Sequence, residues 1–330
     1  MKALVYTGNK SLKYRVEKNP LLKKNEQIIK VVASGICGSD MHAYNGLDKI
    51  RKKPPLILGH EVSGFNNSNK PVVINPIVNC KKCKACKEKN ENLCNNFSMI
   101  GMSKPIKRQG GFADYVAVPN SNIIAVPPKT NLYHAALTEP TAVSLHAINL
   151  AIYHSKIKIN FSKILIIGAG SIGLLISIIL QNKGAKNITM IDINKNRLKE
   201  CKKNSSISVS NPNSARIKNH NFDLVFDAVG NIATRSKSLQ STKEGGVIVH
   251  VGLSSSAGGI DFLKITRKEI IFIGSFAYSI KEFNQSLLMI SKKQLGNLSW
   301  LDFCPLKDGQ GVFKSIDNAN INAPKTILIP

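Results

Sequence analysis

The sequence predicts an α/β protein built from a mostly β N-terminal part and a doubly wound parallel sheet. With 330 residues, of which 43% are hydrophobic, the chain can bury a large core, and the usual domain size of roughly 100–200 residues favours two domains. The hydrophobic pattern also changes near Phe161. Before this residue, short alternating segments are separated by Gly, Pro and Asn, whereas after it strand patterns alternate with helical patterns.

The first part is predicted to be mostly β because its apolar segments are short and either alternate with polar residues or are β-branched. The expected strands are Lys2–Thr7, Glu26–Ala33, Pro71–Pro76, Gly111–Val118 and Ile123–Val126. The second part has longer helical stretches between its apolar β segments, which implies a parallel sheet covered by helices on both faces. Its expected strands are Lys163–Ile167, Ile188–Ile191, Asp223–Ala228, Gly246–Val251 and Ile270–Ser275.

The tail of the chain is predicted to contain a helix at Phe283–Ile290 and a strand at Lys325–Ile329, with no further βαβ unit. We expect this tail to return to the first part. The predicted organisation is therefore a first domain over residues 1–142, a second domain over 143–280 and a C-terminal segment over 281–330.

The formal net charge of +26 raises the possibility of nucleic-acid binding, because a basic surface attracts phosphates. However, only seven of the 46 basic residues are Arg, the residue that forks onto phosphates and guanine edges. The chain is also rich in Asn and Ile, whose codons share the A and T bias of Lys codons. No basic stretch is interleaved with aromatic residues, so we expect no nucleic-acid partner.

The beginning of the chain, Met1–Gly8, lacks the apolar run of a signal peptide, which favours a cytoplasmic location. Ile164–Asn182 is uncharged over 19 residues, about the length of a membrane span, but a glycine turn interrupts it. A buried strand that runs into a buried helix explains this stretch better, so no membrane partner is expected. An odd number of cysteines, seven, favours metal ligation over disulfides.

The turn Gly168–Gly173 reads G-A-G-S-I-G, follows an apolar strand and opens an apolar helix, which is the context of a dinucleotide-binding motif. Its first glycine makes the tight turn, its second lets the backbone approach a pyrophosphate, and its third lets helix and strand pack closely. The sequence therefore predicts a Rossmann-type sheet. The alternative is a glycine turn without a cofactor.

Asp192 ends the next strand, about 20 residues on, where an acidic residue hydrogen-bonds the adenine ribose. Because this carboxylate would repel a 2′-phosphate, NAD is favoured over NADP, although Lys195 and Arg197 lie nearby. Further cofactor contacts, with sheet packing as the alternative, are expected where later strands end, at Asp227, Gly230, Val251, Gly252 and Ser275. The full predicted cofactor set is Gly168, Gly170, Ser171, Ile172, Gly173, Asp192, Arg197, Val251, Gly252 and Ser275.

Cys80, Cys83, Cys86 and Cys94 form a C-x2-C-x2-C-x7-C pattern in a lysine-rich stretch. Four thiolates from one short loop close a tetrahedron around zinc, and such a structural site has no open position. Neighbouring lysines help to keep the thiols deprotonated. The alternatives are buried free cysteines, disulfides or an iron–sulfur cluster.

A second constellation is dispersed along the first part and comprises Cys37, His60, Glu61 and Glu139. One thiolate, one imidazole and one or two carboxylates suit a catalytic zinc that keeps a position open for water or substrate. Each residue alone has an ordinary structural explanation, such as a small core cysteine or a surface His-Glu pair. Their occurrence together, ahead of a cofactor motif, is what predicts a second zinc site.

The sequence resembles the zinc-dependent medium-chain dehydrogenase/reductase (alcohol dehydrogenase) family, and within it the polyol branch typified by sorbitol dehydrogenase and galactitol-1-phosphate 5-dehydrogenase. The matching motifs are Gly35–His42 (G-I-C-G-S-D-M-H), Gly59–Gly64 (G-H-E-V-S-G), the four-cysteine loop, Gly110–Val116 (G-G-F-A-D-Y-V), Glu139-Pro140, the glycine turn and the ending Lys325–Pro330. The resemblance implies a GroES-like catalytic domain beside the Rossmann domain.

The resemblance also implies roles for individual residues. Cys37, His60 and Glu61 would ligate the catalytic zinc, and Glu139 would be a further ligand or hold the zinc-bound water. Glutamate at position 139, where classical alcohol dehydrogenases carry cysteine, points to the polyol branch. Asp40 would orient His60.

Two further side chains complete the predicted site. Ser39 would take the substrate hydroxyl proton, and His42 would pass it to solvent. The alternative for both Ser39 and Asp40 is a turn or a helix cap.

This sequence departs from the family pattern at two places. Between Glu61 and Cys80 the family usually carries about ten more residues, whereas here Val62–Asn69 turns straight into Lys70–Ile74, a length that fits a tight hairpin. Sorbitol dehydrogenases also tend to carry arginine at the position of Ala277, and this difference weakens the inference of the substrate from that branch.

The sequence thus predicts an enzyme with two zinc ions per chain and NAD, which oxidises a secondary hydroxyl of a polyol or related alcohol to the ketone. A homo-oligomer, dimer or tetramer, is expected. Alternatives of the same class are polyol-phosphate, L-threonine and 2,3-butanediol dehydrogenases. The alternative of a different class is a zinc- and NAD-binding protein without turnover.

Overall fold

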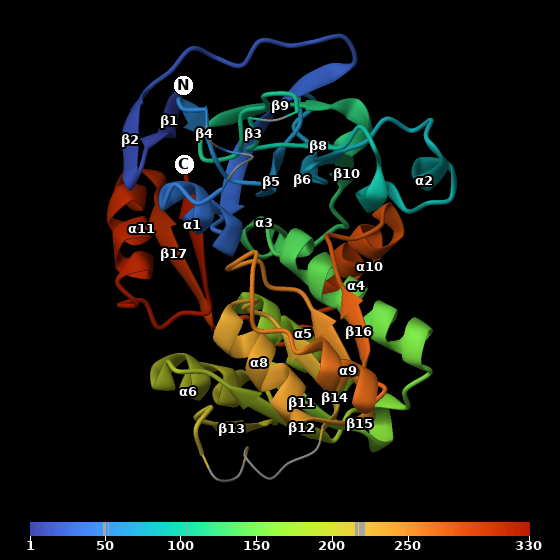
Figure 1. Ribbon diagram of the computed structural model, residues 1–330. Helices are drawn as coiled ribbons and strands as arrows, with labels where there is room; N and C mark the ends of the chain where they lie inside the picture. Colours follow the sequence, from blue (N-terminus) through green and yellow to red (C-terminus); the bar gives the residue numbers. More distant parts are fainter. Residues whose placement is uncertain (49–50, 52, 104, 215–216, 218–221) are drawn as a thin grey trace.

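The computed structural model describes the chain except for residues 49–50, 52, 104, 215–216 and 218–221. Figure 1 shows two parts, with N-terminal strands gathered at one end and a helix-covered sheet at the other. Helices α4 (Thr138–Ser155) and α10 (Ile280–Ser291) lie between them. The chain therefore has the predicted combination of a β-rich part and an α/β part.

The first part is built on two sheets. One is a three-stranded sheet of order β2-β1-β4, and the other is a seven-stranded mixed sheet of order β10-β6-β5-β3-β18-β17, in which β9 also pairs with β3. A small ladder joins β7 and β8. The strands are β1 (Lys2–Gly8), β2 (Ser11–Val16), β3 (Glu26–Gly35), β4 (Leu56–Ile57), β5 (Glu61–Phe65), β6 (Pro71–Ile74), β7 (Ile77–Val78), β8 (Ser98–Met99), β9 (Tyr115–Pro119) and β10 (Ile123–Ala125).

The short helices of the first part connect these strands. They are α1 (Gly38–Tyr44), α2 (Lys84–Lys87), η1 (Glu91–Leu93), η2 (Asn120–Asn122) and α3 (Leu132–Ala135). The expected strand at Gly111–Val118 begins later, at Tyr115, because the amides of residues 110–112 donate to the carbonyls of residues 57–59 instead of joining β3. The predicted hairpin is present, since β5 and β6 pair antiparallel with Phe65 opposite Pro71.

The second part is a six-stranded parallel sheet of order β13-β12-β11-β14-β15-β16, the doubly wound order in which the strand sequence reverses beside β11. Its strands are β11 (Lys163–Ile167), β12 (Asn187–Ile191), β13 (Ser208–Ser210), β14 (Phe222–Asp227), β15 (Thr242–His250) and β16 (Ile271–Gly274). The connecting helices are η3 (Ile159–Phe161), α5 (Ser171–Asn182), α6 (Lys195–Asn204), α8 (Ile232–Ser241) and α9 (Phe262–Arg267).

The prediction that the tail contains no further βαβ unit is wrong. Strand β17 (Leu301–Pro305) runs parallel to β18 (Lys325–Ile329), and η4 (Leu306–Asp308) with α11 (Gly309–Asp317) forms the crossover, so the tail does contain a further βαβ unit. Strand β17 could not be recognised from its sequence pattern, because most of its positions are exposed and it ends in a proline. As expected, the tail rejoins the first part, because β18 pairs with β3.

Buried apolar residues form a large core under the parallel sheet and smaller ones in the first part. No helix of the described residues is long and apolar enough to cross a membrane. The domain boundaries stay a prediction. The one at 142/143 falls inside α4, and the one at 280/281 falls at the beginning of α10.

Candidate active site and metal centres

Two neighbouring strands bring the dispersed constellation together. Strand β3 ends at Gly35 opposite Glu61, the first residue of β5, so Cys37 just after β3 lies beside His60 and Glu61. One ligand atom from each of Cys37, His60 and Glu61 lies within 4.8 Å of the others. His60 and Glu61 are buried, while Cys37 is partly exposed. A thiolate, an imidazole and a carboxylate this close fit a zinc ion with an open position.

Asp40 combines the two roles that the sequence left open, a cap at the beginning of α1 and a partner that orients His60. Its Oδ2 accepts a hydrogen bond from the Cys37 amide (3.0 Å), and its Oδ1 lies 3.5 Å from Nδ1 of His60. Burial opposes the charge on both side chains, but their mutual attraction prevails and lowers the pKa of Asp40 while raising that of His60. The carboxylate therefore faces Nδ1, which leaves Nε2 as the nitrogen for a metal.

Glu139 lies in the first turn of α4 and is only 5% exposed. It is outside the three-residue group but close enough to interact electrostatically with His60 and Glu61. Burial, reinforced by the Glu61 charge, raises the pKa of Glu139 to about 7 against the opposing effects of His60 and Lys325. A buried carboxyl beside a proposed metal is suited to hold a water molecule or a substrate hydroxyl.

Lys325 is a member of this site that the sequence did not predict. It is 3% exposed, its Nζ forms an ion pair with Glu61, and the same Nζ donates to the carbonyl of Ile36 (2.8 Å). The Glu61 carboxylate is also closely packed, since a Cβ at Gly35 would lie 1.9 Å from its Oε2. Lys325 thus holds one of the three proposed ligands in place.

Ser39 and His42 both lie on α1, with a second unpredicted cation next to them. Arg51 is 3% exposed, forms an ion pair with Asp48, and donates from Nη2 to Ser39 Oγ at 3.4 Å. Burial and the Arg51 charge lower the pKa of His42, against the pull of Asp48. His42 is therefore neutral near pH 7, the state in which an imidazole can accept a proton.

The four-cysteine loop brings its sulfur atoms together as predicted. One Sγ from each of Cys80, Cys83, Cys86 and Cys94 lies within 4.8 Å of the others, and all four thiols are free. The Sγ atoms of Cys83 and Cys94 are 3.8 Å apart, well beyond a disulfide bond. Backbone amides of Lys82 and Cys83 lower the pKa of Cys80 to about 6. The pKa of Cys83 is also lowered by backbone amides, whereas burial raises the pKa of Cys86 to about 12. Four convergent sulfurs from one loop fit a closed zinc tetrahedron.

The glycine turn has the geometry that a dinucleotide requires. Gly168 adopts φ +109°, and a Cβ at Gly173 would lie 1.9 Å from the Gly168 carbonyl oxygen. By contrast, a Cβ at Gly170 would meet nothing within 4 Å, so the turn is open where a pyrophosphate would approach. Ser171 and Ile172 are the first two residues of α5 and directly follow Gly170. The backbone amides at the beginning of a helix are available to bind a phosphate group.

Asp192 lies at the end of β12 and is tied to the same turn. Its carboxylate accepts from the amides of Ala169 (2.6 Å) and Asn194 (2.7 Å). Arg197 lies in the first turn of α6, and its Nε is buried without a hydrogen-bond partner among the described residues. The carboxylate thus has a structural role in addition to its predicted contact with the ribose.

The later strand ends divide into two groups. Asp227 is fully buried, and its carboxylate accepts from the amides of Val229 and Gly230 and from the Thr234 hydroxyl, which favours the packing alternative for this side chain. Gly252 packs against the backbone of Val229. Val251 and Ser275 follow β15 and β16, and the buried Ser275 Oγ has no partner within the part of the chain that the structure describes.

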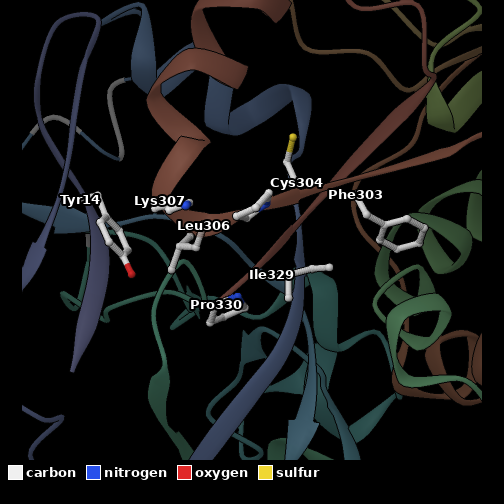
Figure 2. A pocket seen from close by; sticks show the side chains of 8 residues that line it. Tyr14, Phe303, Cys304, Leu306, Lys307, Ile329 and Pro330 are labelled. Atoms are coloured by element: carbon white, nitrogen blue, oxygen red, sulfur yellow. The ribbon is translucent and has the colours of Figure 1, made fainter.

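A pocket of about 270 Å³ lies away from these groups (Figure 2). It is lined by Tyr14, β17 and η4 residues, and the chain end, with Lys307 as its charged side chain. None of the proposed metal ligands lines it. This pocket is therefore not part of the candidate active site.

Comparison with known proteins agrees with this geometry. Residues 23–128 match the family model of the alcohol dehydrogenase GroES-like domain, and residues 171–292 match that of the zinc-binding dehydrogenase. Sorbitol dehydrogenase of Bacillus subtilis is 30% identical over 84% of this chain and 83% of its own length. L-Idonate 5-dehydrogenase (NAD(P)(+)) of Escherichia coli is 28% identical over 89% of this chain and 87% of its own length.

Among solved structures, L-idonate 5-dehydrogenase of Escherichia coli superposes with a TM-score of 0.88 at 27% identity. The match covers 100% of this chain and 98% of that chain. The fold agrees with that structure, and the two family models match both parts of the chain. The chain belongs to the zinc-dependent medium-chain dehydrogenase/reductase family.

Proposed function

We propose that the protein oxidises a secondary hydroxyl of a polyol or a closely related sugar derivative to the ketone, with NAD as the hydride acceptor. The observation that carries this proposal is the convergence of Cys37, His60 and Glu61 beside the buried Glu139. A set with one cysteine and two carboxylates suits a hydroxyl-rich substrate. The sorbitol and L-idonate dehydrogenases, to which the chain is similar, support this substrate class.

Cys37, His60 and Glu61 would hold the catalytic zinc, with Glu139 as a further ligand or as the partner of a bound water, and the four-cysteine loop would hold a structural zinc. When bound, the catalytic zinc supplies Lewis-acid chemistry that favours ionisation of the alcohol, and NAD supplies the hydride acceptor. The amides at the beginning of α5 would bind the cofactor pyrophosphate, and Ser275 would contact the cofactor from the end of β16.

The proton leaves by a separate route. Ser39 would accept the substrate hydroxyl proton, and His42 would pass it to solvent. The hydrogen bond from Arg51 occupies one acceptor position of Ser39 Oγ, so the serine hydroxyl is oriented before substrate arrives. The hydride goes to NAD and the proton to solvent, which balances the oxidation of the alcohol.

We further propose a preference for NAD over NADP, resting on Asp192. Its carboxylate would bond the ribose and repel a 2′-phosphate. Asp192→Ser should raise the ratio of kcat/KM for NADP to that for NAD by about tenfold or more, with Glu200→Ser, a partly exposed acid on α6, as the control. A wild-type preference for NADP would show that the role given to Asp192 is wrong.

The substrate proposal is tested by NADH fluorescence over a panel of sorbitol, xylitol, sugar acids such as L-idonate, polyol phosphates, L-threonine and 2,3-butanediol. We expect turnover of polyols or sugar acids that is lost in Cys37→Ser. Turnover confined to L-threonine or a polyol phosphate would instead select one of those alternatives. Binding of NAD without turnover of any compound would favour the non-catalytic alternative.

We also propose a cytoplasmic homo-oligomer, a dimer or tetramer. In support, β16 lies at an edge of the parallel sheet with Ile271 37% exposed, and the neighbouring Phe262 of α9 is 72% exposed. An open sheet edge beside exposed apolar side chains is a common pairing surface. Light scattering after gel filtration would test this, and a monomer at micromolar concentration would contradict it.

A further inference from the structure

The four-cysteine loop contacts the turn between β16 and α10, far along the sequence. Asn92, in η1 between Cys86 and Cys94, is only 6% exposed, and its Nδ2 donates to the carbonyl of Phe276 at 2.7 Å. Next to it, Glu91 accepts from the amide of Ile280 at 3.3 Å. The loop thus holds both ends of the turn 276–280.

A ring contact reinforces this attachment. The rings of Phe97, just after Cys94, and Phe276 lie edge to face with centroids 5.7 Å apart. The turn itself contains Ala277 at φ +52°, a left-handed conformation that is unfavourable for a residue with a Cβ. Such a turn needs support from its surroundings, and the four-cysteine loop is one source of that support.

The same turn carries Tyr278 into the candidate active site. Tyr278 is 1% exposed and packs with α4 residues and with Phe283, whose ring centroid lies 5.6 Å from its own. Its hydroxyl has no hydrogen-bond partner among the described residues, although it is fully buried. Tyr278 lies in one buried cluster with Ala135 and Ala142, which precede and follow Glu139 in the chain, so its ring packs beside the segment that carries Glu139. Burial, reinforced by the Glu139 charge, raises the pKa of Tyr278.

A second anchor fixes the other side of this turn. Ser279 caps α10 and bonds Glu282, and Glu282 in turn bonds His146 and Asn149 of α4. Since α4 also carries Glu139, the turn is held between the helix that bears Glu139 and the four-cysteine loop. The position of Tyr278 relative to Glu139 then depends on both anchors.

We propose that Asn92 is a positioning residue of the active site. By holding the Phe276 carbonyl, it fixes the turn that presents Tyr278 to Glu139. It thereby links the four-cysteine loop to catalysis. The Tyr278 hydroxyl, which is close enough to Glu139 to interact with it, would then help to orient the Glu139 carboxyl. The proposal rests on the proposed dehydrogenase function for its kinetic consequence, but not for its structural one.

The test compares Asn92→Asp with Asn96→Asp, an exposed residue of the same loop that undergoes the same change of charge. Asn92→Asp keeps the shape of the side chain but removes the N–H donor. We expect it to retain two zinc ions per chain, to accelerate amide hydrogen exchange in residues 275–283, and to lower kcat/KM for a polyol by roughly tenfold with an unchanged KM for NAD. Asn96→Asp should behave as the wild type.

A double-mutant cycle with Tyr278→Phe tests the route of the effect. If Asn92 acts through Tyr278, the double variant should be no slower than the slower single variant. Multiplicative effects, loss of zinc from Asn92→Asp, or exchange equal to that of Asn96→Asp would each overturn the proposal. The exchange measurement needs no substrate, so its failure is distinguishable from failure of the proposed function.

Discussion

Lys325, in the last strand of the chain, forms a buried ion pair with Glu61, which lies 264 residues earlier in the sequence. Both side chains are at most 2% exposed. A carboxylate removed from water requires a compensating charge, and Lys325 supplies it. A bound zinc would supply a second one, so the C-terminal strand and the metal both stabilise the ionised form of Glu61.

Lys325→Met should therefore lower the free energy of unfolding of the zinc-free protein by about 3–5 kcal/mol, because it leaves a buried charge without its partner. The loss should be smaller in the zinc-loaded protein, where the metal offsets the Glu61 charge. Chemical denaturation in EDTA and in zinc measures both values, with the exposed Lys314→Met as the control. Equal losses in the two conditions would contradict this account.

The two zinc sites should be separable. Wild-type protein should contain two zinc ions per chain, and Cys83→Ser and Cys37→Ser should each contain one. Cys83→Ser should lower Tm by at least roughly 5 °C, because the loop loses its crosslink. Cys37→Ser should retain its fold and lose turnover. Metal analysis and calorimetry test this, with Cys304→Ser, a thiol outside both clusters, as the control; full activity with one zinc or none would refute it.

The attachment of α10 to α4 should depend on pH. Burial opposes ionisation of Glu282, but hydrogen bonds from His146, Ser279 and Asn149 prevail and lower its pKa from 4.5 to about 2. A carboxyl with a lower pKa in the folded state contributes stability that is present above pH 4.5 and is lost as the pH falls toward 2.

Glu282→Gln should accordingly reduce the free energy of unfolding by roughly 2 kcal/mol at pH 7, and the difference from wild type should shrink between pH 4.5 and pH 2. Urea denaturation across this range measures it. Glu200→Gln, which breaks a partly exposed pair with Lys203, should cost little at any pH. A difference that grows at acid pH would have the wrong sign.

The four-cysteine loop and the glycine turn can be predicted from the sequence because their chemistry is local. Four cysteines in fifteen residues leave few alternatives, and the glycine turn is recognisable from its flanking strand and helix. The loop and the turn depend on spacing and residue type, both of which are visible in a single sequence. Cys37, His60 and Glu61 are dispersed, so their grouping is expected from their joint occurrence and from the family resemblance, and the pairing of β3 with β5 brings them together.

The side chains that hold the proposed ligands and their neighbours in place could not be predicted from local sequence patterns. Lys325 and Arg51 are two of many basic residues, and their burial depends on contacts far along the chain. Strand β17 escapes notice because it is an exposed edge strand, and Asp227 resembles a cofactor contact until its three loop hydrogen bonds are seen. Tertiary packing decides these features, so local patterns do not reveal them.

The last prediction concerns the substrate and depends on Glu139. The buried Glu139 carboxyl would give a second hydroxyl of the substrate a polar partner, while the reacting hydroxyl would lie at the position that Cys37, His60 and Glu61 surround. A hydrogen bond to a charged group contributes roughly 1.5–3 kcal/mol, and a site built to make it rejects substrates that lack the hydroxyl. We therefore expect kcat/KM for 2,3-butanediol or a polyol to exceed that for 2-butanol by about tenfold or more.

Glu139→Gln keeps the size of the side chain and removes its charge, so it should erase much of this preference, whereas Glu244→Gln on the surface should leave it unchanged. The ratio of the two kcat/KM values is the relevant measurement, because a general loss of activity lowers both values and leaves the ratio intact. If 2-butanol were oxidised as well as 2,3-butanediol and every polyol tested, Glu139 would have no part in recognising a second hydroxyl. The polyol assignment would then fail, while oxidation of 2-butanol would still require a dehydrogenase built on Cys37, His60 and Glu61.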